Sequence, residues 1–227
     1  MDEILDADSP IHGNDRVRIG LSPIPRAGKG LFLTDDSPAF TEVSRAKPVV
    51  MTVAEGLQDK ICDWCYVKTD DEYDLQHYLP DKDKKSIKRC ASCKEVGYCS
   101  KECQQKAWHA YHKVECKMFR STIYRQRPRD HPMDRHMSAT YRLLCMQKMG
   151  TFSDEQLRRV MKLPHNEDEL FKTELVKKGL ATHDKPHFRA RVSNITAATG
   201  CTLTYDQVYE LAIIVSLIGP IIRMKHH

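Results

Sequence analysis

The sequence has no apolar run long enough to cross a membrane. Its longest apolar stretch, residues 211–222, is interrupted by Ser216 and by the pair Gly219-Pro220, whereas a spanning helix needs about 20 consecutive apolar residues. The N-terminus is acidic and has no apolar signal region. These absences predict a protein of the cytosol or nucleus, where thiols stay reduced.

Charge and size exclude little. The chain has 227 residues, a net charge of +5, 41% hydrophobic residues and 30% charged residues. This length suffices for one large domain or two small ones. The mild positive charge tolerates an acidic partner but requires none, and we do not expect nucleic-acid binding.

Nine cysteines are present, and seven of them fall between residues 62 and 116. In a reducing compartment such clustering favours metal binding over disulfides. The candidate ligands form four pairs: Cys62 and Cys65, Cys90 and Cys93, Cys99 and Cys103, His112 and Cys116. The last two pairs have the i, i+4 spacing that places both side chains on one helix face. Because structural zinc takes four ligands in a closed tetrahedron, eight ligands predict two structural sites with no position for a catalytic water.

One ligand position has two candidates. His112 shares a helix face with Cys116, whereas His109 is seven residues, or nearly two turns, away. We therefore favour His112 and keep His109 as the alternative. The two remaining cysteines, Cys145 and Cys201, are expected to be buried small hydrophobic residues. The cysteine block is short and poor in apolar residues, so we expect bound zinc to supply its folding free energy.

The chain outside the cysteine block divides by composition into an α+β arrangement. Residues 1–16 are polar and predict a loose tail. Residues 17–61 predict a small β segment with three short strands, at 17–19, 30–33 and 47–53. Inside the cysteine block, the insert at 66–89 between the first two cysteine pairs is expected to be a solvated loop.

Residues 117–227 predict a helical region. Five helices are expected, at 134–149, 153–163, 166–179, 186–199 and 204–218. The second and fifth begin with the capping-box patterns Ser153-x-x-Gln156 and Thr204-x-x-Gln207. Apolar residues at helical spacing between 205 and 218 predict a core face. We expect this face to lack its packing partner in this chain.

The cysteine block resembles the MYND finger. The runs RCASCKEVGYCSKECQ at 89–104 and AWHAYHKVEC at 107–116 are very close to the family pattern. The resemblance implies interleaved pairs: Cys62, Cys65, Cys99 and Cys103 would hold one zinc, and Cys90, Cys93, His112 and Cys116 the other. Two departures are visible. The insert is long, and three residues rather than the commoner two separate Trp108 from His112.

A second resemblance is to SET-MYND proteins, a lysine methyltransferase family in which the finger interrupts a SET domain. In that family a Gly-x-Gly turn precedes the finger and touches S-adenosylmethionine. The run AGKGLF at 27–32 stands at the matching distance from Cys62. The resemblance implies a SET-like segment at 17–61, with S-adenosylmethionine bound by Gly28, Lys29 and Gly30.

The other SET motifs are not found. SET enzymes have an Asn-His-Ser-Cys-x-Pro-Asn stretch and a later active-site tyrosine, but this sequence has no Asn-His dipeptide, and residues 213–227 do not resemble the family. We therefore expect an incomplete SET core, in a truncated or fragmentary chain, and assign no catalytic residue. Two interpretations remain open. One is a methyltransferase-family protein acting on a lysine-bearing protein, and the other is a non-catalytic adaptor whose finger binds proline-rich peptides.

Overall fold

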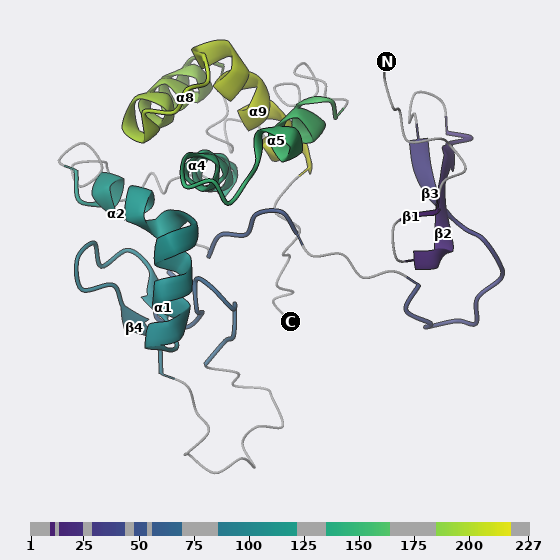
Figure 1. Ribbon diagram of the computed structural model, residues 1–227, viewed down its shortest axis with the longest axis horizontal. Coiled ribbons are helices and arrows are strands. Elements are labelled where there is room, and N and C mark those ends of the chain that lie inside the picture. Colours follow the sequence, from purple (N-terminus) through teal and green to yellow (C-terminus); the bar gives the residue numbers. More distant parts are fainter. Residues whose placement is uncertain are drawn as a thin grey trace, which may run out of the picture. The chain divides into compact units, whose positions relative to one another are not determined.

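The computed structural model describes most of the chain, in two compact units. The described residues are 10–11, 14–24, 29–43, 48–53, 56–69, 86–121, 135–163 and 185–218 (Figure 1). The units comprise residues 1–49 and residues 50–227. Among the described helices, none is both long enough and apolar enough to cross a membrane.

The first unit contains a three-stranded antiparallel sheet. Strands β1 (Pro10–Ile11), β2 (Asn14–Leu21) and β3 (Lys29–Leu33) pair in the order β1-β2-β3. The predicted strands at 17–19 and 30–33 are therefore present. The sheet also begins within residues 1–16, so the expectation of a loose tail is wrong there. Backbone pairing of β1 with β2 orders this stretch, and such pairing needs no apolar side chains.

The strand predicted at 47–53 does not form. Described residues 48–53 have no strand structure, and Lys47 lies outside the described part. The Met51 carbonyl instead accepts hydrogen bonds from Arg142 Nη1 at 2.7 Å and from Tyr66 Oη at 2.8 Å. Side-chain donors thus supply the hydrogen bonds to this carbonyl group that a neighbouring strand would otherwise supply.

The cysteine block forms a hairpin followed by one interrupted helix. Strand β4 (Lys88–Arg89) pairs with β5 (Gly97–Tyr98), and the helix comprises α1 (Lys101–Ala107), the π-turn η3 (Trp108–His112) and α2 (Lys113–Phe119). Both described ends of the insert are ordered, because residue 68 bridges to residue 61 and β4 lies in the hairpin. The prediction of a loop is therefore wrong at these ends, although Lys88 and Arg89 are exposed to solvent as expected. Residues 70–85 lie outside the described part.

Four of the five predicted helices are present: α4 (Arg135–Lys148), α5 (Asp154–Met161), α8 (Lys185–Thr199) and α9 (Tyr205–Ile218). The helix predicted at 166–179 lies outside the described residues. Both capping boxes are formed. Ser153 Oγ accepts from Gln156 N at 3.2 Å, and Thr204 Oγ1 accepts from Gln207 N at 3.3 Å.

One apolar core joins the finger to these helices. Helix α4 lies between the interrupted helix and the α8–α9 pair (Figure 1) and contacts η3, α2, α8 and α9. The core includes Tyr98 and Tyr111 of the cysteine block together with Leu144 of α4 and Val208 of α9. The expectation that the apolar face at 205–218 lacks a partner is thus wrong, and the cysteine block adds its few apolar residues to a core that it shares with the helices.

The two cysteines outside the block differ in burial. Cys145 lies within α4 and is fully buried, as expected, whereas Cys201 is only half-buried. Neither belongs to a group of metal-ligating side chains among the described residues.

Candidate metal centres

Each Cys-x-x-Cys pair lies in the same kind of tight turn. Tyr66 N donates to the Cys62 carbonyl, and Lys94 N donates to the Cys90 carbonyl, both at 2.9 Å. The residue after each second cysteine is left-handed, with φ of 58° at Tyr66 and 63° at Lys94. This conformation costs a non-glycine residue about 1–2 kcal/mol. Two such turns in one small finger indicate that ligand placement determines the local backbone.

The other two ligand pairs lie on the interrupted helix. Ser100 caps the start of α1, where its Oγ accepts from Cys103 N at 3.1 Å. Ser100 follows Cys99 directly, so the first turn of the helix brings the Cys103 side chain back towards Cys99. His112 ends η3, and Cys116 follows one turn later in α2. Both members of this second pair are buried.

The eight predicted ligands meet in two clusters, in each of which all ligand atoms lie within 4.8 Å of one another: Cys62, Cys65, Cys99 and Cys103 in the first, Cys90, Cys93, His112 and Cys116 in the second. These are the interleaved sets that the family resemblance implied. The first cluster is partly exposed, and the second is buried.

The spacing within both clusters fits tetrahedral zinc. Sγ of Cys99 lies 3.5 Å from Sγ of Cys65 and 3.6 Å from Sγ of Cys103. In the second cluster, Cys93 Sγ and His112 Nε2 are 3.7 Å apart. A tetrahedron with Zn–S bonds of about 2.3 Å has S–S edges of about 3.8 Å. The donor sets, Cys₄ and Cys₃His, are those of closed structural zinc sites.

The structure places His109 and His112 in different environments. His112 is fully buried in the second cluster, whereas His109 is exposed and lines a surface pocket. His112 is therefore the histidine that lies with the cysteine ligands.

The unusual spacing between Trp108 and His112 coincides with a π-turn. Lys113 N donates to the Trp108 carbonyl five residues earlier, so the helix widens by one residue here. Within this turn, the Ala110 carbonyl also accepts from Thr151 Oγ1 at 2.6 Å. The helix thus accommodates the additional residue and still brings His112 into the cluster.

A buried charge network lies behind the ligands, and sequence reasoning missed it. Arg142 of α4 is 3% exposed and binds two buried carboxylates. Its Nε lies 2.8 Å from Glu115 Oε1, and its Nη2 lies 2.9 Å from Asp63 Oδ2. The arginine also lies over the Tyr111 ring, 4.3 Å from its centroid.

The network perturbs both carboxyl groups. Burial raises the pKa of Asp63 to about 6, against the opposing attraction of Arg142. Burial acts on Glu115 in the same direction, but attraction by Arg142 and by the neighbouring His112 outweighs it and lowers its pKa. Glu115 is therefore the carboxyl group that stays ionised next to the histidine ligand.

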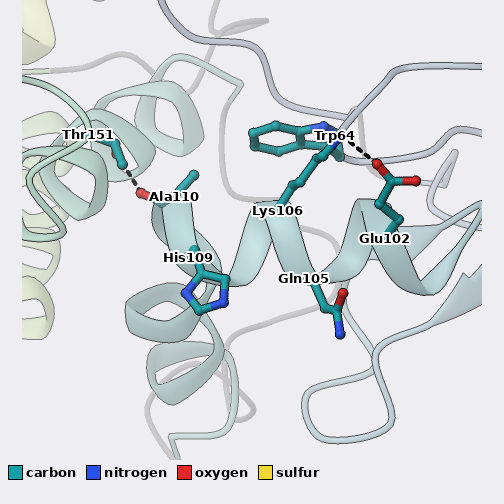
Figure 2. Close-up of a pocket in the computed structure, with 7 residues that line it drawn as sticks. All are labelled: Trp64, Glu102, Gln105, Lys106, His109, Ala110 and Thr151. Carbon is teal, nitrogen blue, oxygen red and sulfur yellow. Dashed lines mark hydrogen bonds and ion pairs between the residues drawn. The ribbon is translucent and has the colours of Figure 1, made fainter.

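A surface pocket of about 580 Å³ lies beside the first cysteine turn (Figure 2). Trp64 forms one wall, and its ring stacks on Tyr111 with centroids 6.2 Å apart. An ion pair between Lys106 Nζ and Glu102 Oε1, 2.6 Å long, joins two side chains of α1 that line the pocket (Figure 2). The lining residues are Trp64, Glu102, Gln105, Lys106, His109, Ala110 and Thr151.

The predicted cofactor residues lie in the other unit. Lys29 and Gly30 begin β3 and pair with Leu21 and Gly20 of β2, while Gly28 lies outside the described residues. The backbone of Gly30 does not have the positive φ that only glycine adopts readily. Within the described part of this unit, no feature supports S-adenosylmethionine binding.

Comparison with known proteins identifies the finger. The sequence model of the MYND finger matches residues 62–116. A SET and MYND domain-containing protein of Dictyostelium discoideum is 36% identical over 96 residues, which are 42% of this chain and 15% of the relative. Histone-lysine N-methyltransferase ASHR1 of Arabidopsis thaliana is 27% identical over 99 residues, 44% of this chain and 17% of the relative. Ubiquitin carboxyl-terminal hydrolase 19 of Arabidopsis thaliana is 51% identical over 39 residues, 17% of this chain and 6% of the relative. The matched part of the chain thus spans less than a fifth of each relative.

Proposed function

From its MYND finger and its similarity to SET and MYND proteins, we propose that this chain is a zinc-organised protein-interaction module. It binds a short proline-rich peptide of a partner protein in the pocket beside Trp64. The combination of two closed ligand clusters with an adjacent aromatic pocket carries this proposal. A closed site has no free coordination position for substrate or water, so binding falls to the surface that the metal sites hold in place.

The pocket is suited to a preformed, weakly polar segment. Trp64 stands between the ligands Cys62 and Cys65, so metal binding fixes its backbone, and stacking on Tyr111 fixes its ring. Proline-rich segments already adopt an extended helix and dock against aromatic surfaces at little entropic cost. The polar groups along the rim, on Gln105, Lys106 and His109, are available to bond the peptide carbonyls.

The chain supplies its own reporter for a test, because Trp64 and Trp108 are its two tryptophans. The Trp108→Phe variant leaves Trp64 as the single tryptophan, whose emission can be excited selectively over that of tyrosine. Titration with a synthetic proline-rich peptide should change its emission in a saturable way. A peptide of the same composition with the prolines replaced by alanine is the matched ligand control.

The complementary variant is Trp64→Phe, which lacks the proposed binding residue and keeps Trp108 as its single tryptophan. Peptide affinity, measured for both variants by calorimetry, should be about tenfold or more weaker in Trp64→Phe than in Trp108→Phe, which corresponds to about 1.4 kcal/mol or more. Trp108 is 38% exposed and does not line the pocket. Binding that depends on Trp108 and not on Trp64 would place the peptide elsewhere and refute this proposal.

A second candidate function is lysine methyl transfer to a partner protein. One relative is named as a histone-lysine N-methyltransferase, and the run at 27–32 is placed as in SET-MYND proteins. The finger alone does not favour this activity, because another relative is named as a ubiquitin hydrolase. Calorimetry with S-adenosylmethionine separates the candidates. Saturable binding that Gly30→Val abolishes would support methyl transfer, and the lack of any binding heat would leave the interaction module.

A further inference from the structure

The buried charge network links the zinc sites to a helix outside the finger. We propose that Arg142 of α4 is a positioning residue for both metal clusters. Through it, zinc binding and the docking of α4 against the finger are thermodynamically coupled. Arg142 does not contact a ligand atom. It acts on the Cys₃His cluster through the carboxylate of Glu115 and on the Cys₄ cluster through the carboxylate of Asp63.

The first route runs through Glu115 to the Cys₃His cluster. Glu115 Oε2 lies 3.5 Å from Nδ1 of His112 and 3.3 Å from Nη2 of Arg142, while Oε1 lies 2.8 Å from Nε of Arg142. The Nε2 atom of His112 faces Cys93 Sγ, so Nδ1 is the nitrogen left to carry a proton. The 3.5 Å contact is an ion-pair contact and not a hydrogen bond, because Nδ1 has no hydrogen-bond partner. A carboxylate beside Nδ1 nevertheless favours a proton on that nitrogen by charge attraction, and so favours the tautomer that leaves Nε2 free for the metal. Arg142 in turn fixes the carboxylate.

The second route runs through Asp63 to the Cys₄ cluster. Asp63 follows Cys62 directly, inside the first cysteine turn, and both of its carboxylate oxygens face Arg142, at 3.1 Å and 2.9 Å. Tyr111 Oη donates to the Asp63 carbonyl at 2.6 Å. The turn that carries two ligands is therefore held from the helix side as well as by the metal.

Charge explains why an arginine occupies this position. Both carboxylates are about 1% exposed, so each needs a buried cation or hydrogen-bond donors. The planar guanidinium group has two edges of N–H donors, so it can donate hydrogen bonds to both carboxylates at once. Its Nη1 also donates to the Met51 carbonyl at 2.7 Å. Removing this one side chain would leave two buried carboxylates next to two clusters of thiolates.

The coupling can be measured by metal affinity in the full chain. Cobalt(II) is bound in place of zinc, because its absorption bands differ between Cys₄ and Cys₃His sites. Arg142→Met should weaken metal binding at both sites by about 10–100-fold, the usual effect of losing a partner behind the ligands. Glu115→Gln should weaken the Cys₃His site alone. Arg158→Met removes an exposed arginine that pairs with Glu155 and should change neither site.

Site selectivity separates positioning from general destabilisation. A merely structural loss would weaken both sites equally in Arg142→Met and in Glu115→Gln. Arg142→Lys keeps the charge but loses the two-edged geometry, so its affinities should fall between those of the native protein and Arg142→Met. Native affinity and native cobalt spectra in Arg142→Met would overturn the proposal.

A measurement on the native protein covers the case in which Arg142→Met does not fold. Hydrogen exchange is compared across α4 with zinc bound and after chelation. The coupling predicts that chelation lowers protection in α4 as well as in the finger. Unchanged protection of α4 in the metal-free protein would overturn the proposal.

Discussion

Replacing Gly97 with alanine should disturb the packing between the two metal clusters. Gly97 lies in β5, and its carbonyl accepts from Asp63 N at 2.8 Å. A Cβ atom at this position would lie 2.3 Å from the Gln58 carbonyl oxygen and 2.3 Å from Ile87 Cγ2. No real Cβ contact is this short, so the surrounding chain must move.

The size of the effect follows from these two contacts. Each of these two distances must increase by about 1 Å or more to reach ordinary van der Waals separation. The oxygen belongs to the backbone, and the preceding carbonyl, of Leu57, accepts from Lys60 N and Ile61 N. Overpacking typically costs about 1–3 kcal/mol, and we expect about 3 kcal/mol because backbone must shift. For a unit of this size, the melting temperature should fall by about 6–12 °C.

Thermal unfolding of the zinc-loaded chain, followed by circular dichroism, measures this shift. Gly30→Ala is the matched control in the other unit, because its Cβ would make only ordinary van der Waals contacts, with the Phe32 ring at 3.4 Å and with Ser22 Cβ at 3.9 Å. The control should melt within about 1 °C of the native protein. A Gly97→Ala protein that melts as the native protein does would refute the close packing described here.

Three further predictions concern the metal sites and the helices. His112→Ala should lower bound zinc from two equivalents towards one, and His109→Ala should leave it at two, because only His112 lies in a cluster; elemental analysis of both variants decides this. Leu211→Ala empties a fully buried position in α9 and should cost about 2–5 kcal/mol in urea unfolding, whereas a cost well under 1 kcal/mol would mean that this face is not packed. Zinc release to a chromogenic chelator should accelerate as the pH falls from about 7 to 5, because protons compete for thiolate and imidazole ligands; a rate independent of pH would contradict thiolate binding.

The ligand sets were accessible from the sequence because they depend on short spacings. Paired cysteines, and the Ser153 and Thr204 capping boxes, are local patterns whose geometry the backbone dictates within one or two turns. The interleaving of the pairs came from family resemblance, and the structure shows the same grouping. The additional residue before His112 was visible as a departure, but its consequence, a π-turn stabilised by Thr151, was not.

Long-range contacts explain what sequence reasoning missed. Arg142 lies 27 residues from Glu115 and 79 from Asp63, and an isolated charge in a helical pattern is usually interpreted as surface. The apolar stretch at 47–53 has a strand-like pattern, yet Arg142 from α4 binds its Met51 carbonyl. The apolar face of α9 seemed to lack a partner, because nothing local in the sequence shows that α4 covers it.

Metal content of the purified full chain, measured together with hydrogen exchange, tests the central claim most directly. The account predicts two equivalents of zinc per chain, and a marked loss of amide protection across residues 86–121 when a strong chelator removes them. A chain that carries no stoichiometric zinc, or a metal-free chain that keeps its protection over these residues, would contradict it.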